Sequence, residues 1–371
     1  MIYADNAATT KLDADAFEAM LPFLLEEYGN ASQPYSFSRN TKKALRDARS
    51  IIASCIGASA EEIYFTSGGT ESDNWAIKGL MYPGDSQLTI TSQIEHHAVL
   101  NACASVERMG FPVRYLPVNR EGIIELELFQ ASISTQTKLV SVMLANNEIG
   151  TVEPVSVLAE IAHEHGALFH TDAVQAVGHI PVDVKALGVD LLSASGHKFN
   201  GPKGVGFLYI KKGTEIQSYA DGGRQEFGIR AGTENVASIV AMACALQKNC
   251  DRMATVTERL SRMEYIFFHK LNQSGVDYIR NGANNHIPGN INISIRDTSG
   301  ESLLHRLDLK GICISTGSAC DSVNTQVSHV IRAIGVPEEY VQGTIRISFG
   351  ADNVESDASE VAEALVKILR I

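Results

Sequence analysis

The chain has 371 residues, of which 44% are hydrophobic and 20% are charged, and its formal net charge is −12. This length allows two domains with a large core, and the acidic balance argues against direct binding to nucleic acid or to a membrane surface. Six cysteines without a CxxC pair argue against a disulfide framework or a structural zinc site. No signal-peptide pattern and no bilayer-length apolar stretch is visible, so we expect a cytoplasmic protein.

The first part of the chain predicts helices before any long strand. Helical spacing of apolar residues runs over 13–25 and again over 41–56, where Gly57 ends the pattern. A strand is expected at 62–66. The glycine-rich turn Ser67-Gly-Gly-Thr-Glu71 then leads into a helix at 72–80.

The middle of the chain predicts strands that alternate with helices. Alternation of this kind indicates β-α-β units and a largely parallel sheet that is covered on both faces. Ligands gather at the carboxyl ends of the strands in such sheets. The expected strands are 87–91, 113–116, 139–144 and 168–171, and the expected helices are 98–109, 126–134 and 155–165.

Two further apolar runs, 189–194 and 205–210, flank Lys198. They predict a strand, an exposed loop and a second strand, with a lysine at the end of a buried strand, which suits a lysine that forms a Schiff base. The alternative is a basic surface loop, and Lys203 is an equally visible candidate. This stretch alone does not choose between the two lysines.

The last third of the chain changes character. A loop at 221–235 precedes a long helix at 236–271. Short strands at 290–294 and 345–349 then alternate with helices at 301–309 and 356–369, which indicates a smaller α+β domain.

Polar clusters follow the strands of the expected sheet. The turn at Gly68, Gly69 and Thr70 presents backbone N–H groups at a helix N-terminus and could bind an anion, or it could be a tight turn without a ligand. Asp172 follows its strand and could hold a proton on a heterocyclic nitrogen, or it could cap a helix. His96 could present an imidazole over the same crevice, and no further metal ligands accompany it, so we expect no metal.

Taken together, these clusters indicate one cofactor. An anion-binding turn, an imidazole, an amide, an acid and a lysine all fall at strand ends. Pyridoxal phosphate requires such a set, because it needs a phosphate cradle, a ring-stacking group, a partner for the pyridinium nitrogen and a Schiff-base lysine.

Seven ordered motifs also resemble a known family over essentially the whole chain. They resemble the cysteine desulfurases of the class V aminotransferase family. The motifs are Tyr3-Ala-Asp-Asn-Ala-Ala-Thr-Thr10, Thr66-Ser-Gly-Gly-Thr-Glu-Ser72, Glu95-His-His-Ala-Val99, Asn146-Asn-Glu-Ile-Gly150, His170-Thr-Asp-Ala-Val-Gln175, Ser195-Gly-His-Lys-Phe-Asn-Gly-Pro-Lys-Gly204 and Arg230-Ala-Gly-Thr-Glu-Asn235.

The resemblance implies an α/β protein of fold type I: a homodimer whose large domain contains a mostly parallel seven-stranded sheet flanked by helices. The expected domains are 15–253, which would bind pyridoxal phosphate, and 1–14 with 254–371, a smaller α+β domain. The smaller domain would carry a catalytic cysteine loop at about 313–328.

The resemblance also assigns roles to individual residues. It places pyridoxal phosphate on Lys198, with Asp172 at the pyridine nitrogen and His96 stacked on the ring. The remaining roles are Asn147 and Gln175 at the 3′-oxygen or the substrate, Gly69, Thr70, Ser195 and His197 at the phosphate, and Thr233 reaching the phosphate from the partner subunit.

Two residues of the second half select the reaction. Cys320 lies in the small, polar stretch Ser315-Thr-Gly-Ser-Ala-Cys320, which resembles the group I desulfurases of iron–sulfur assembly, and it would be the nucleophile. Cys313 lies in an apolar run and is typical of a core cysteine. Arg346 matches the arginine that binds the substrate carboxylate, although a solvated strand-end arginine is the alternative.

We therefore expect a cysteine desulfurase that converts L-cysteine to L-alanine and leaves a persulfide on Cys320 for an acceptor protein. Selenocysteine lyase, another class V activity and a catalytically silent adaptor are the alternatives. The acceptor could serve an iron–sulfur scaffold, tRNA thiolation or DNA phosphorothioation. Two loops depart from the family pattern, with Arg224 and Phe227 in one and Tyr35 in the other.

Overall fold

A computed structural model describes residues 1–82, 87–316 and 327–370. Its centre is a seven-stranded sheet in the order β2-β8-β7-β6-β5-β3-β4. Every neighbouring pair is parallel except the two that involve β8, which runs antiparallel to β2 and β7. The strands are β2 (Ile63–Thr66), β3 (Leu88–Ser92), β4 (Val113–Leu116), β5 (Thr137–Ser141), β6 (Leu168–Asp172), β7 (Leu191–Ser195) and β8 (Gly206–Ile210).

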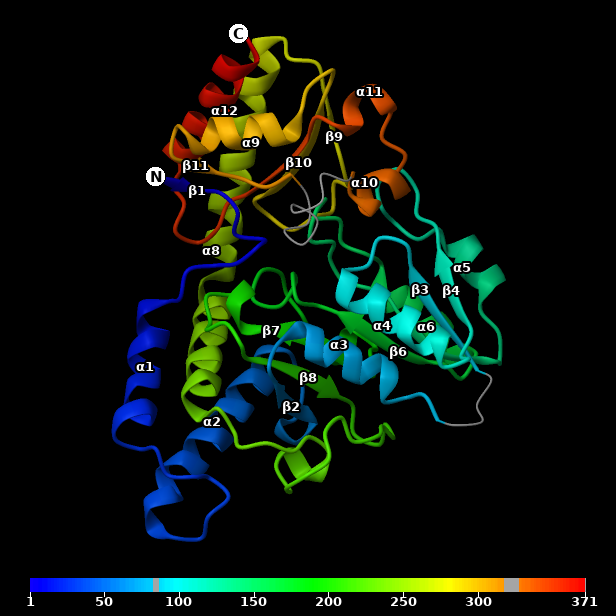
Figure 1. Cartoon of the computed structure of the whole chain (residues 1–371), viewed down its shortest axis with the longest axis vertical. Coiled ribbons are helices and arrows are strands. Elements are labelled where there is room, and N and C mark those ends of the chain that lie inside the picture. Colours follow the sequence, from blue (N-terminus) through cyan, green and yellow to red (C-terminus); the bar gives the residue numbers. More distant parts are fainter. Residues whose placement is uncertain (83–86, 317–326, 371) are drawn as a thin grey trace.

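Helices cover both faces of this sheet (Figure 1). Side chains of successive residues point to opposite faces of a strand, and the buried clusters divide in that way: Phe207 packs in one cluster and Leu208 in another. The helices of this part are α1 (Ala14–Leu25), α2 (Arg39–Cys55), α3 (Gly69–Lys78), α4 (His97–Arg108), α5 (Leu126–Ser132), α6 (Val155–Glu164), α7 (Val184–Leu187) and α8 (Val236–Ser274).

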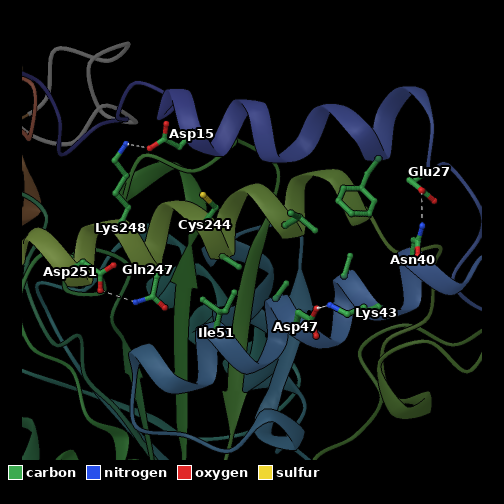
Figure 2. A pocket seen from close by; sticks show the side chains of 15 residues that line it. Asp15, Glu27, Asn40, Lys43, Asp47, Ile51, Cys244, Gln247, Lys248 and Asp251 are labelled. Atoms are coloured by element: carbon green, nitrogen blue, oxygen red, sulfur yellow. Dashed lines mark hydrogen bonds and ion pairs between the residues drawn. The ribbon is translucent and has the colours of Figure 1, made fainter.

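Helices α1, α2 and α8 pack beside one another at one side of the sheet, around a groove of about 780 Å³ (Figure 2). Its rim carries ion pairs, including Lys248 Nζ to Asp15 Oδ2 at 2.5 Å. Its floor is apolar and includes Ile51 and Ala48. None of its lining residues belongs to a strand of the sheet.

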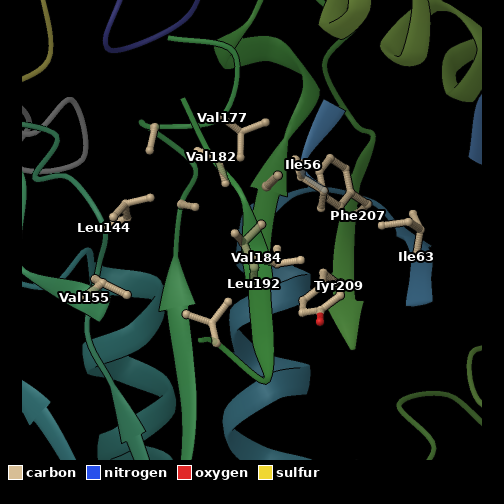
Figure 3. Close-up of a cluster of buried hydrophobic side chains, with 14 of the residues drawn as sticks. Ile56, Ile63, Leu144, Val155, Val177, Val182, Val184, Leu192, Phe207 and Tyr209 are labelled. Atoms are coloured by element: carbon tan, nitrogen blue, oxygen red, sulfur yellow. The ribbon is translucent and has the colours of Figure 1, made fainter. Parts of the chain in front are cut away.

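The larger core lies between the sheet and helices α2, α6 and α8 (Figure 3). Strand residues Leu192 and Phe207 are completely buried there. Ile56, just after α2, and Val155, at the start of α6, pack into the same cluster. Burial of this apolar surface supplies most of the stability of the part that carries the site.

A smaller unit follows the long helix α8, which reaches from one unit to the other (Figure 1). Its core combines Ala4 with apolar residues from Leu260 to Ile368. This composition supports the division into 15–253 and 1–14 with 254–371, which stays a prediction. Among the described residues, its elements are a sheet β12-β10-β9, a parallel pair β1-β11 and the helices α9 to α12. Their bounds are β1 (Ile2–Tyr3), β9 (Tyr278–Arg280), β10 (Asn290–Ile295), β11 (Ile312–Cys313), β12 (Thr344–Ser348), α9 (Gly300–Asp308), α10 (His329–Ala333), α11 (Glu338–Val341) and α12 (Glu355–Leu369).

The fold confirms the predicted seven-stranded α/β architecture but corrects one local prediction. The first part of the loop after β7 is not exposed: it forms a 3-10 turn at Gly196–Lys198, and Phe199, Asn200 and Gly201 are buried, whereas Lys203 and Gly204 are exposed. Asn249 on α8 donates to the Phe199 carbonyl at 2.7 Å, and the Asn200 backbone N–H donates to Thr10 Oγ1 at 2.8 Å. Long-range hydrogen bonds, which a local pattern cannot reveal, therefore hold this loop against the protein.

Gly206 on β8 allows the turn before α3 to approach the sheet. A Cβ atom at this position would lie 2.4 Å from the Ala194 carbonyl oxygen and 2.7 Å from Gly68 Cα. We expect Gly206→Ala to destabilise the protein by about 3 kcal/mol, because both obstructing atoms belong to the backbone. A lowered melting temperature measures this effect.

Gly204→Ala provides the comparison. Gly204 has φ +76° but open space around it, so alanine there incurs only the backbone strain of about 1 kcal/mol. Equal melting temperatures for the two variants would contradict the packing argument.

Candidate active site

A cavity of about 240 Å³ opens at the carboxyl ends of the sheet strands, between the sheet and β12. Although it is smaller than the groove of Figure 2, it gathers most of the polar side chains that the sequence singled out. Its lining consists of Ala7, Ala8, Gly69, Thr70, Asp73, His96, Met143, Asn147, Asp172, Val174, Gln175, Ser195, His197, Lys198 and Arg346.

Lys198 enters this cavity from the 3-10 turn after β7. Its Nζ donates to the carbonyl oxygens of Ala7 at 2.7 Å and Ala8 at 2.8 Å. Lys203 is exposed and does not line the cavity. The fold therefore separates two lysines that the local pattern left open, and Lys198, which the family motif favours, is the one in the cavity.

Asp172 is the last residue of β6 and is 4% exposed. Burial raises the pKa of Asp172 to about 6, against the opposing effects of a hydrogen bond from the Val174 backbone and of the Lys198 charge. The Val174 N–H donates to Asp172 Oδ1 at 2.9 Å. No helix begins immediately after Asp172, so the helix-cap interpretation is wrong.

A second buried carboxyl in the cavity, that of Asp73 on α3, was not predicted from the sequence. It lines the cavity and is 1% exposed, and its Oδ1 lies 3.7 Å from Nε2 of His170. Burial and then the charge of Asp172 raise the pKa of Asp73 well above its ordinary value. Its position four residues after Gly69, one turn along α3, was the signal that could have indicated it.

His96 is the N-cap of α4 and its Nδ1 accepts from the Ala98 backbone N–H at 3.1 Å. Ligand atoms of His96, Asp73 and Asp172 lie within 4.8 Å of one another, so the fold provides neighbours that sequence inspection did not find. Such a set could hold a metal ion. Because Lys198 and Arg346 line the same cavity, a protonated heterocycle with an anionic group fits the charges better than a divalent cation.

The part of the cavity at the start of α3 suits a phosphate. Helix α3 begins at Gly69 with free N–H groups, and a Cβ on Gly69 would lie 2.6 Å from Val174 Cγ2, so a side chain would crowd this turn. Thr70, Ser195 and His197 line the cavity around it. His197 Nδ1 lies 3.1 Å from Thr9 Oγ1, and burial, with the charges of two lysines, lowers the pKa of His197 to about 4.

Arg346 lies at the middle of β12 and is 1% exposed, so the solvated alternative is wrong. Its guanidinium donates to Asp5 Oδ1 and to the Asn147 carbonyl, both at 2.8 Å. Within 1–82, 87–316 and 327–370, its buried Nε has no hydrogen-bond partner. A guanidinium with a spare buried donor at a cavity wall is suited to bind a carboxylate.

The remaining predicted residues differ in what the structure shows of them. Thr233 is exposed and does not line the cavity of its own chain, so its predicted approach from a partner subunit stays a prediction. Cys320 lies outside the described residues. Ser315, at the start of its stretch, pairs through its backbone with Arg346, at 2.7 and 3.0 Å. Gln175 lines the cavity and donates to the Ala7 carbonyl at 3.0 Å.

Comparison with known proteins places this geometry in a family. The Aminotransferase class-V family matches residues 2–361. This chain belongs to that family.

Individual relatives agree with this assignment and confirm the resemblance to cysteine desulfurases. "Cysteine desulfurase IscS" of Dictyoglomus turgidum is 48% identical over 371 residues, which cover 99% of this chain and 94% of the relative. A solved "NifS-like protein" superposes with a TM-score of 0.94 at 34% identity, covering 100% of this chain and 99% of that one. "SspA in complex with cysteine" gives 0.84 at 34% identity, covering 94% and 99%.

Class V enzymes are pyridoxal-phosphate-dependent, and the residues of this cavity fit that group. A lysine, a buried acid and a glycine-rich helix start face one cavity, and it can hold one small heterocycle. No helix among the described residues is long and apolar enough to cross a membrane.

The buried carboxyl of Glu153 makes the free energy of unfolding depend on pH. Burial raises the pKa of Glu153 from 4.5 to about 8, although the Ile124 backbone N–H donates to it at 3.2 Å. Because the folded pKa is raised, the stabilising contribution is fully present below 4.5 and is lost as the pH rises to about 8. Glutamine at position 153 does not titrate, so Glu153→Gln should not lose this stability as the pH rises.

We therefore expect the difference in unfolding free energy between Glu153→Gln and wild type to grow in favour of the variant as the pH rises. The growth is at most about 1.4 kcal/mol per pH unit within that window. Denaturant unfolding at several pH values measures this difference. Glu164→Gln, at an exposed position on α6, is the control and should parallel wild type. Parallel curves for Glu153→Gln and wild type would contradict the assignment.

Proposed function

We propose that this chain is a pyridoxal-phosphate-dependent cysteine desulfurase, which takes the sulfur of L-cysteine and leaves L-alanine. The observation that carries the proposal is one cavity that presents Lys198, Asp172 and Arg346 together. The relatives named as cysteine desulfurases, and the neighbour described in complex with cysteine, support the choice of substrate.

The cofactor would lie with its phosphate at the start of α3 and its ring nitrogen at Asp172. When bound, pyridoxal phosphate withdraws electrons from the substrate Cα and so lowers the barrier to removal of its proton. An ionised Asp172 keeps the proton on the ring nitrogen, because a nearby negative charge favours the charged form of the base. His96 would lie over the ring, and Asn147 and Gln175 near its 3′-oxygen or the substrate.

The chain's own groups would then divide the reaction between them. Arg346 binds the carboxylate of cysteine and fixes Cα. Lys198 Nζ removes the Cα proton and returns a proton to Cα after the sulfur has left. The thiolate of Cys320 attacks the substrate sulfur: a sulfur–sulfur bond forms, the bond from sulfur to Cβ breaks, and Cβ receives the electron pair and then a proton. The products are alanine and a persulfide on Cys320.

Transfer of this persulfide requires an acceptor protein, and the names of the relatives favour one in iron–sulfur assembly. The homodimer, the contribution of Thr233 across it, and the cytoplasmic location are parts of the same proposal. The net charge of −12 suggests that any nucleic-acid pathway is reached through another protein.

The assignment of Lys198 can be tested by trapping the cofactor. Borohydride should fix a pyridoxyl group on the lysine that holds the aldehyde, and peptide mass spectrometry locates it. We expect the label on Lys198 in wild type and in Lys203→Arg, and none in Lys198→Arg. A label on Lys203 would contradict the assignment.

The assignment of Cys320 can be tested against a matched cysteine. Cys320→Ala should retain the visible absorbance of the bound cofactor but lose sulfide release in the presence of a thiol reductant, down to background. Cys313→Ala, on the half-buried strand β11, should retain most of the activity. Sulfide release above background in Cys320→Ala would contradict the assignment of Cys320 as the nucleophile.

A further inference from the structure

Two arginine–glutamate pairs fasten the 221–235 loop to the large unit. Glu226 accepts from Arg49 of α2 at 2.7 and 2.8 Å and from the Phe65 backbone N–H at 2.9 Å. Arg230 forms a second fork with Glu71, where Nε lies 2.8 Å from Oε1 and a terminal nitrogen lies 3.1 Å from Oε2. The first pair lies at β2, whereas the second lies at the start of α3.

The second pair acts on the turn that precedes the cavity. Glu71 is the third residue of α3, and its Oε2 accepts from the Ser67 backbone N–H at 3.0 Å and from Ser67 Oγ at 2.5 Å. Ser67 begins the turn Ser67-Gly-Gly-Thr70, whose Gly69 and Thr70 line the cavity. Arg230 therefore fixes the side chain of Glu71, which in turn fixes Ser67 at the start of the turn.

The charge of Arg230 gives a second reason why its pair with Glu71 favours phosphate binding. The Glu71 side chain is 10% exposed, and burial opposes its charge, but the hydrogen bonds from Arg230 and Ser67 hold the pKa of Glu71 below its usual 4.5. It is therefore ionised, one residue from the proposed phosphate cradle. An unpaired carboxylate there would repel a phosphate, and Arg230 neutralises it.

We propose that Arg230 is a positioning residue for the cofactor's phosphate group, acting through Glu71. This inference rests on the proposed function, because it requires that pyridoxal phosphate occupies the cavity. It predicts a selective effect: loss of Arg230 should weaken binding of the phosphate group and not of the ring.

The test compares pyridoxal phosphate with pyridoxal, which lacks the phosphate. Trp75, the one tryptophan of the chain, is buried in α3 and provides a fluorescence signal for binding to the cofactor-free protein. We expect Arg230→Met to raise the Kd for pyridoxal phosphate at least about tenfold, and to change the Kd for pyridoxal by less than about threefold. An equal loss for both ligands would overturn the proposal.

A second substitution separates the action through Glu71 from a general loosening of the loop. Arg230→Met with Glu71→Gln removes both charges, and a glutamine oxygen can still accept from Ser67. This double variant should bind pyridoxal phosphate more tightly than Arg230→Met alone. Binding as weak as in the single variant, or weaker, would contradict the proposal.

Arg49→Met is the matched control, because it breaks the other fork of the same loop. It should not distinguish the two ligands, and the same selectivity as in Arg230→Met would count against a specific role. Melting temperatures establish that each variant folds. If Arg230→Met does not fold, Arg230→Lys should show the same selective loss in smaller degree, since it keeps the charge but loses the fork.

The wild-type protein separates this inference from the proposed function. Wild type that binds pyridoxal phosphate and forms alanine supports the function whatever the variants do. Wild type that binds pyridoxal as tightly as its phosphate would overturn the positioning role of Arg230, whereas a failure to form alanine from cysteine would overturn the proposed function.

Discussion

The site depends on one short segment, residues 5–8, which binds both of its cations. The carbonyl oxygens of Ala7 and Ala8 accept from Lys198, and the Asp5 carboxylate accepts from Arg346 at 2.8 Å. The segment is itself fixed on β12, where the Ala7 N–H donates to Ser348 Oγ at 2.9 Å. A lysine of the large unit and an arginine of the small unit are therefore positioned by the same short segment, which fixes their relative place in the cavity.

Charge balance is the second constraint. Asp73, Asp172 and Glu95 are all buried at or behind the cavity, and burial raises the pKa of Glu95 to about 8. Burial lowers the pKa of His170, which lies among them, to about 3, so this imidazole is neutral and compensates no carboxylate. A cofactor that brings a protonated ring nitrogen supplies a positive charge at this position. The buried carboxyls, whose burial costs free energy in the cofactor-free protein, thus contribute to binding of the protonated ring.

Much of this could be predicted from sequence because the chemistry is local in the chain. Gly69, Asp172 and Lys198 each lie at or just after the end of a strand, and strand ends converge at one edge of a parallel sheet. What could not be predicted came from long-range packing: the burial of the loop after Lys198, the approach of Ala7 and Ala8, and the inward position of Asp73. Arg346 could be matched to a motif, but only the fold shows that it is buried and paired with Asp5. The roles of Cys320 and Thr233 still rest on the motifs.

In the proposed reaction this cavity removes the sulfur atom of cysteine and leaves the rest of the amino acid intact. The most direct test is a single turnover of the cofactor-loaded protein with L-cysteine, without reductant and without a keto acid, followed by amino-acid analysis and intact mass. We expect one alanine for each sulfur atom that the protein gains. Pyruvate and ammonia in place of alanine, a requirement for a keto acid, or alanine without sulfur on the protein would contradict it.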